Sequence, residues 1–202
     1  RAPAAAVSSL ALSDDIGGLQ KRQVAGTAAR LRRLDAVWEL AEAEPDEIDR
    51  ADLLLAAAGA LVDDPSMLVD VSDLIDGATR DTDDTALGWE TRIRTAAAEI
   101  WLRAGSAERA LDLLRPSTDD ERRWDGHIVI GALLHLGRAD DAHTFVTEVA
   151  RRDPGEAARL TVQLADAGLS TMADELVTEL LGTSPDGEVW PYAWHTLACR
   201  LT

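Results

Sequence analysis

The chain repeats one pattern of residues between Gly137 and Pro185. The first copy, residues 137–154, reads GRADDAHTFVTEVARRDP, and the second copy, residues 168–185, reads GLSTMADELVTELLGTSP. Each copy begins with Gly, has Ala five residues later and ends with Pro. The two glycines are 31 residues apart, and so are the two prolines. A period of this length is typical of proteins built from stacked pairs of helices.

The rest of the chain has helical periodicity as well. Apolar residues recur at three- and four-residue spacing, and no segment alternates polar and apolar residues as a half-buried strand does. We therefore expect an all-α fold of about ten helices. One long helix is expected from about residue 15 to residue 40, followed by a helix pair over residues 46–78 whose second helix ends near Gly77. Thr118 and Glu121 have capping-box spacing and predict a later helix start.

The expected domain organisation follows from this periodicity. Residues 1–14 are rich in Ala and Ser and are expected to form a flexible arm or linker. Residues 15–202 are expected to form a single helical-repeat domain, with degenerate hairpins over 15–80, better preserved hairpins over 87–185 and a C-terminal capping helix over 187–202. The chain begins with Arg1, which we interpret as a sign of a fragment or a processed form.

Composition and charge exclude several classes of partner. The 202 residues carry a formal net charge of −17, and 46% of them are hydrophobic. A chain this acidic repels phosphate backbones and anionic membranes, so we expect neither nucleic acid nor a membrane as partner. The one cysteine, Cys199, rules out an internal disulfide and fits a cytoplasmic protein. High-GC codon usage and salt adaptation are two open explanations for the acidity.

Residues 137–185 resemble the tetratricopeptide repeat, and the resemblance extends over roughly Leu87 to Thr202. The residues that carry it are Gly137, Ala142 and Asp153-Pro154 in one copy, Gly168, Ala173 and Pro185 in the next, and Gly105 with Ala110 in an earlier one where Pro116 comes too soon. The resemblance implies an α-solenoid of stacked antiparallel hairpins whose concave groove binds a protein or peptide. A generic helical-hairpin solenoid is the alternative. A strongly acidic groove would favour a basic or apolar ligand over an acidic one.

The faces expected to form such a groove are residues 126–136 and 157–167. The candidate partner-binding residues on them are Val129, Leu133, Leu160, Gln163 and Leu164. A second candidate surface is the stripe of Trp190, Trp194, Leu197 and Leu201 on the last predicted helix. We expect this stripe to cover the open end of the array, because terminal repeats need covers. A partner or dimer interface is the other reading of the same stripe.

No catalytic, cofactor-binding or metal-binding motif is recognisable. Asp81 to Thr85 begins like a calcium loop but lacks the Gly and the terminal Glu that such a loop needs. The four histidines have no metal-ligand spacing, and His195 with Cys199 lacks an oxyanion element. We expect a non-enzymatic scaffold or adaptor module without cofactors. A regulatory or sensor domain of a larger signalling or transcription protein is one alternative, and an enzyme with an unrecognised site is another.

Overall fold

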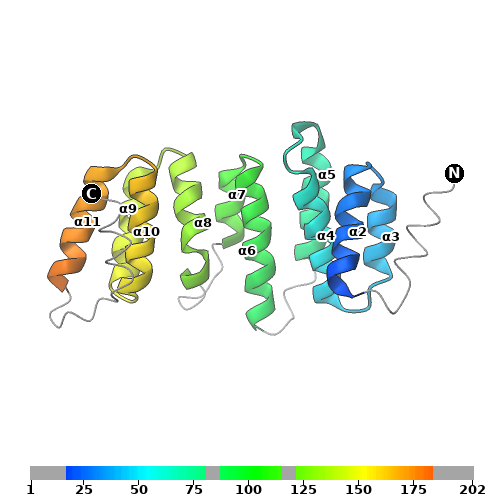
Figure 1. The fold of residues 1–202 in the computed structure, drawn as a ribbon, viewed down its shortest axis with the longest axis horizontal. Coiled ribbons are helices and arrows are strands. Elements are labelled where there is room, and N and C mark those ends of the chain that lie inside the picture. The colour runs from blue at the N-terminus through cyan, green and yellow to red at the C-terminus, as the bar shows by residue number, and fades with distance from the viewer. Residues whose placement is uncertain (1–16, 81–86, 115–121, 184–202) are drawn as a thin grey trace. The chain divides into compact units, whose positions relative to one another are not determined.

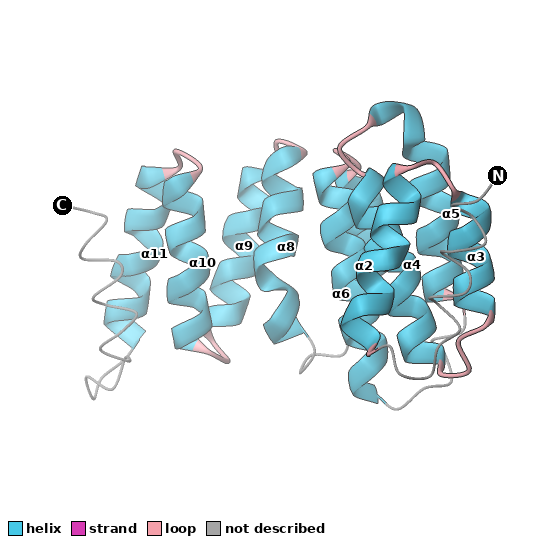
Figure 2. Ribbon diagram, turned by 45° about the vertical axis from the view of Figure 1, so that its right-hand side comes forward, coloured by secondary structure: helices cyan, strands magenta, loops and turns pink. Residues whose placement is uncertain are grey.

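The computed structural model describes residues 17–80, 87–114 and 122–183, and within these ranges the chain is all-α (Figures 1 and 2). These ranges contain ten α-helices, one 3-10 helix and no strand, which confirms the predicted all-α character. The predicted solenoid of stacked hairpins stays a prediction. The helices are α2 (Gly18–Arg30), α3 (Leu34–Glu42), α4 (Glu47–Leu61), η1 (Pro65–Met67), α5 (Leu68–Thr79), α6 (Leu87–Arg103), α7 (Ala107–Leu114), α8 (Arg122–His135), α9 (Ala139–Ala150), α10 (Pro154–Asp166) and α11 (Ser170–Thr183).

The chain divides into two compact units, Arg1–Leu113 and Leu114–Thr202. In the first unit, α4 packs against α2, α3, α5 and α6, and in the second, α10 packs against α8, α9 and α11. We call α2, α4, α6, α8 and α10 the first helices, and α3, α5, α7, α9 and α11 the second helices, because they alternate along the chain. The expectation of one continuous repeat domain over residues 15–202 stays a prediction.

Four of the five helix pairs are joined by the same turn. In each turn one residue has a left-handed backbone, with φ of 57° at Arg32, 75° at Gly105, 68° at Gly137 and 85° at Gly168. Its N–H donates to the carbonyl three residues earlier, and the next N–H donates to the carbonyl five residues before it. This is the hydrogen-bond pattern of the Schellman motif, which satisfies carbonyls at the end of a helix. In all four pairs the second helix begins two residues after the left-handed residue.

The first of these turns corrects one sequence prediction. The long helix expected up to residue 40 is two helices, α2 and α3, separated at Leu31–Arg33. The N–H of Arg32 donates to Ala29 O at 2.7 Å, and the N–H of Arg33 donates to Ala28 O at 2.9 Å. The sequence does not predict this break, because the left-handed position, which favours Gly, is occupied here by Arg. The apolar periodicity also continues from α2 into α3.

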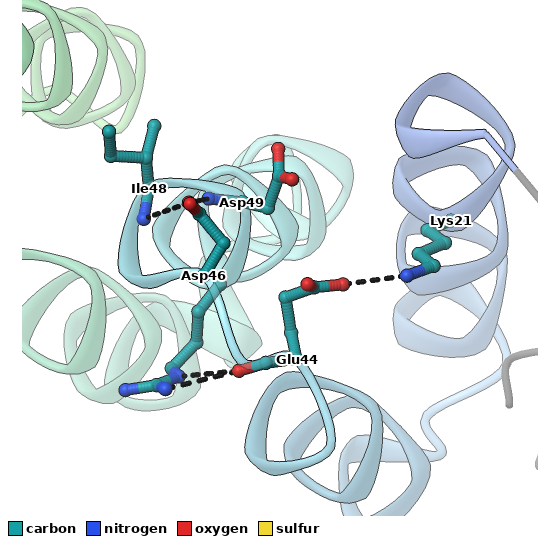
Figure 3. A network of polar contacts seen from close by, with 6 residues as sticks. Lys21, Glu44, Asp46, Ile48 and Asp49 are labelled. Atoms are coloured by element: carbon teal, nitrogen blue, oxygen red, sulfur yellow. Dashed lines mark hydrogen bonds and ion pairs between the residues drawn. The ribbon is translucent and has the colours of Figure 1, made fainter. Parts of the chain in front are cut away.

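The pair α4 and α5 has a different connection, which contains η1, and both α4 and η1 begin at aspartate caps. Asp46 Oδ1 accepts hydrogen bonds from the N–H groups of Ile48 and Asp49 at 2.9 and 3.0 Å and so begins α4 (Figure 3). Asp64 Oδ1 accepts from the N–H of Ser66 at 3.0 Å, just before η1. Each cap satisfies backbone donors that have no partner within the helix.

Helix α5 continues past its predicted end near Gly77 to Thr79. Gly77 is an internal helical residue that gives space to a neighbour: a Cβ atom added there would lie 2.6 Å from Trp38 Cη2 and 3.2 Å from Leu54 Cδ1. The glycine therefore serves packing between α5 and α3 rather than helix termination.

Ion pairs connect the helices of the first unit. Lys21 Nζ of α2 lies 2.7 Å from the carboxylate of Glu44, which is largely buried at the end of α3 (Figure 3). Asp52 of α4 pairs with two guanidinium groups, Arg22 of α2 at 2.6 Å and Arg92 of α6 at 2.9 Å. These pairs join successive first helices on one side of the unit.

In the second unit, α10 begins at Pro154, with Asp153 Oδ1 accepting from the N–H of Glu156 at 3.0 Å. Helix α8 begins at Arg122. Its predicted capping box, Thr118 to Glu121, lies outside the described residues. On α8 the buried residues include Ile128, Ile130, Ala132 and Leu133.

Candidate functional site

Helices α8 and α10 carry the predicted partner-binding residues and pack against each other. Gly126 of α8 permits a close approach, because a Cβ atom added there would lie 3.1 Å from Leu160 Cδ1 and 3.4 Å from Glu156 Oε1. Gln163 Nε2 of α10 donates a hydrogen bond of 2.8 Å to the backbone oxygen of His127. The two helices are thus joined by packing and by a side-chain hydrogen bond.

Three of the five predicted binding residues lie in the core. Leu133, Leu160 and Leu164 have exposed fractions of 6%, 1% and 0%. Val129 and Gln163 are half-buried. A core side chain offers no surface to a partner in the folded state, so Val129 and Gln163 are the two predicted residues with surface to contribute. The apolar stripe of a helix marks the side that faces the core, and the prediction had placed this stripe on the binding face.

The solvent side of α8 is formed by residues that were not among the predicted partner-binding residues. His127 and His135 are exposed, and Gly131 and Leu134 are half-buried. Gly131 follows His127 by four residues, and Leu134 and His135 follow Gly131 by three and four. The four residues therefore lie along one side of the helix. The eight-residue spacing of the two histidines was the signal that could have identified this side. We call these four residues, together with Gln163, whose side chain is hydrogen-bonded to the backbone of His127, the first-helix surface of the second unit. Val129 is two residues from His127 and therefore lies on the opposite side of α8.

The remaining predicted sites lie outside the described residues. They are the stripe of Trp190, Trp194, Leu197 and Leu201, the acidic segment 81–85, and the pair His195 and Cys199. The capping role of the stripe and its alternative role as an interface stay predictions.

Charge is distributed very unevenly between the two sets of helices. Among the side chains that the structure describes, the first helices carry eight carboxylates and eight Lys or Arg residues. The second helices carry fourteen carboxylates and one arginine, Arg109. Helices α3, α5 and α9 contain three carboxylates each and no Lys or Arg. Among the described helical side chains, the excess of carboxylates is therefore concentrated on the second helices, and the first helices are close to neutral.

Nearly all of these second-helix carboxylates face solvent. Thirteen of the fourteen are exposed, and Asp70 is half-buried. They are Asp35, Glu39, Glu42, Asp70, Asp73, Asp76, Glu108, Asp112, Asp140, Asp141, Glu148, Asp174, Glu175 and Glu179. Like charges three or four residues apart on one helix, such as Asp73 and Asp76, repel one another.

Two carboxyl groups are held ionised by their local partners. Asp35 accepts hydrogen bonds from Arg33 at 2.9 and 3.1 Å, and this contact lowers the pKa of Asp35 below its ordinary value of 3.8 while it raises the pKa of Arg33. Asp64 accepts from the hydroxyl of Ser66 at 2.7 Å and from its N–H, which lowers the pKa of Asp64 in the same way. Both groups lie at helix starts, where a negative charge is favourable.

Within residues 17–80, 87–114 and 122–183, no group of three or more His, Cys, Asp or Glu side chains has the geometry to hold a metal ion. None of the helices in these ranges is long and apolar enough to cross a membrane.

No protein-family model, no curated protein and no solved structure matches this chain in comparison. The arrangement of the helices and the chemistry of their surfaces are therefore the basis for a functional proposal.

Proposed function

We propose that the chain is a non-enzymatic module that binds a protein or peptide through its first helices, within a tetratricopeptide-like α-solenoid. The observation that carries the proposal is the recurrence of one hydrogen-bonded turn at Arg32, Gly105, Gly137 and Gly168, followed each time by a second helix at the same distance. A recurrent helix pair with short turns supports a repeat array. Such arrays commonly present an extended surface to a macromolecule.

The proposed binding surface is the first-helix surface of the second unit. It combines two exposed histidines with the half-buried apolar group of Leu134. This surface combines polar and apolar groups and has little net charge, which suits a peptide with apolar side chains and few charges. A strongly basic ligand would find more complementary charge on the second helices.

The test is affinity capture from an extract of the native host, with the full chain as bait. The bait variant His127→Glu/His135→Glu places two negative charges on the proposed surface. The matched variant, Thr144→Glu/Thr178→Glu, places the same charges at exposed positions of α9 and α11. We expect at least one captured protein to be lost with the histidine variant and retained with the threonine variant.

Identical capture by both variants would count against the first-helix surface. Purified wild-type chain that turns over a small molecule, with the histidine variant retaining every captured protein, would replace the proposal by an enzymatic one. Circular dichroism of each bait confirms that a lost interaction is not a loss of fold.

A further inference from the structure

Side-chain contacts connect the second helices of the first unit. Gly77 of α5 lies against Trp38 of α3, and Arg109 Nη1 of α7 donates to Ser72 Oγ of α5 at 3.1 Å. Helix α5 therefore contacts both α3 and α7. Their exposed carboxylates, together with Leu68 and Val69, are called the acidic face below.

Several carboxylates on this face lie where they disfavour the helix that carries them. The C-terminal end of a helix carries a partial negative charge, so carboxylates there are unfavourable. Yet Glu42 is the last residue of α3, Asp76 lies in the last turn of α5, and Asp112 lies in the last turn of α7. Glu148 repeats this placement in α9, whereas among the first helices only α10 does so, with Asp166. Helix stability does not account for the choice of these residues.

A general need for a charged surface does not account for it either. An adaptation to salt, or a compositional bias, would place excess carboxylates on every exposed helix. The described side chains of the first helices are instead balanced, with eight of each sign. Among the described helices, the excess negative charge lies on the second helices and not on the first helices. It is therefore a property of one set of helices rather than of every exposed helix.

The acidic face also exposes apolar side chains. Leu68 and Val69 begin α5 with exposed fractions of 37% and 72%. Val69 lies on the same side of α5 as Asp73 and Asp76, four and seven residues further on. On the other four second helices, the structure describes no exposed large apolar side chain. Apolar groups edged by charge of one sign are typical of docking surfaces for segments of opposite charge.

We infer that the acidic face docks a polypeptide segment rich in Lys and Arg, which places an apolar side chain on Leu68 and Val69. This interaction is distinct from the proposed binding on the first helices of the second unit. Guanidinium and ammonium groups complement carboxylates spread over three helices. The same charge repels the phosphates of nucleic acids and anionic lipids.

The test uses the full chain and a fluorescein-labelled peptide of Lys and Leu at helical spacing. The matched probe replaces every Lys with Glu. We expect the Lys/Leu peptide to bind in fluorescence anisotropy, with affinity that falls as salt rises, and the Glu/Leu peptide not to bind. The variant Asp73→Asn/Asp76→Asn is expected to weaken binding roughly fivefold, and Val69→Ser roughly threefold.

The control variant is Glu47→Gln/Asp49→Asn, which removes the same charge from exposed positions of α4, a first helix of the same unit. We expect less than a twofold change for it. Equal losses in the two double variants would show general attraction to an acidic protein and overturn the inference. Absence of binding by the wild-type chain, or binding of the Glu/Leu peptide, would overturn it too.

Discussion

At the scale of single residues, the turn that joins the helix pairs depends on one left-handed position. Gly occupies it at 105, 137 and 168, and a Cβ atom added at any of the three would meet nothing within 4 Å. Arg32 occupies the same position in the first pair with φ of 57°. A side chain in this region is strained because its Cβ approaches the following carbonyl. The four turns therefore differ in backbone strain while sharing their hydrogen bonds.

We predict that Arg32→Gly stabilises the protein. Relief of the left-handed strain adds about 1 kcal/mol to the free energy of unfolding. Part of this gain is offset because Gly has more conformational entropy than Arg in the unfolded chain. The ion pair of Arg32 with Asp64, 3.1 Å long and mostly exposed, contributes little. The midpoint temperature of thermal unfolding should rise by roughly 2–4 °C per kcal/mol for a chain of this size. Arg32→Ala loses the ion pair but keeps the Cβ atom, so it should give no gain; a rise equal to that of the glycine variant would refute the strain explanation.

Two glycines inside helices should respond to alanine with opposite signs. At Gly77 the added methyl group meets Trp38 at 2.6 Å, whereas at Gly59 the nearest atom is Ile100 Cδ1 at 4.0 Å. Gly59→Ala should stabilise by about 1 kcal/mol through helix propensity. Gly77→Ala should destabilise by about 1 kcal/mol, because an overpacking cost of about 1–3 kcal/mol exceeds that gain. Urea unfolding measures both, and a stabilised Gly77→Ala would contradict the packing described for Trp38.

At the scale of helices, the effect of a carboxylate on stability depends on the end of the helix at which it lies. Aspartates at helix starts, such as Asp46 and Asp64, satisfy backbone donors. Carboxylates at the ends of second helices do not. Charge at Asp49, in the first turn of α4, therefore differs in its effect from charge at Asp76, in the last turn of α5, although both side chains are exposed.

We predict opposite effects for two neutralising substitutions of exposed aspartates. Asp76→Asn should stabilise the protein by about 0.5 kcal/mol, because it removes a negative charge from the negative end of a helix. Asp49→Asn should destabilise it by a similar amount, about 0.5 kcal/mol, because it removes one from the positive end. Differential scanning calorimetry at low salt compares them. Stabilisation in both variants would mean that net charge, rather than position on the helix, governs the effect.

The cap at Asp64 predicts a pH dependence. Its folded pKa is lower than its ordinary 3.8 because Ser66 donates to the ionised carboxylate. The stabilisation from this cap is therefore fully present above the ordinary pKa and is lost as the pH falls through the folded pKa. Asp64→Asn should be less stable than wild type at neutral pH, with a difference that shrinks on acidification below 3.8. A difference that stays constant between neutral and acid pH would contradict this role.

The sequence was sufficient for the helices whose ends carry recognisable signals. Gly137, Gly168 and Pro154, which bound the repeated sequence pattern, lie at helix ends and starts, because their backbone preferences are intrinsic. The break at Arg32 and the continuation through Gly77 were missed, because tertiary contacts override propensity there. The buried Leu133, Leu160 and Leu164 were assigned to a surface because periodicity identifies a face without saying what covers it.

At the scale of the whole molecule, the chain has two chemically different sets of helices. The first helices are charge-balanced and, at His127 and His135, expose aromatic polar groups; the second helices carry the negative charge. Total net charge, the quantity accessible from composition, hides this division. The proposed function assigns partner binding to the first helices of the second unit, and the inferred basic segment belongs to the acidic face of the first unit.

The decisive measurement is hydrogen exchange of the full chain, with and without the captured protein that the His127→Glu/His135→Glu variant fails to bind. Binding through the first-helix surface predicts that amides of α8 and α10 exchange more slowly in the complex, while those of α9 and α11 keep their free rates. Slower exchange confined to α9 and α11, or no change in either unit, would contradict the proposed binding surface.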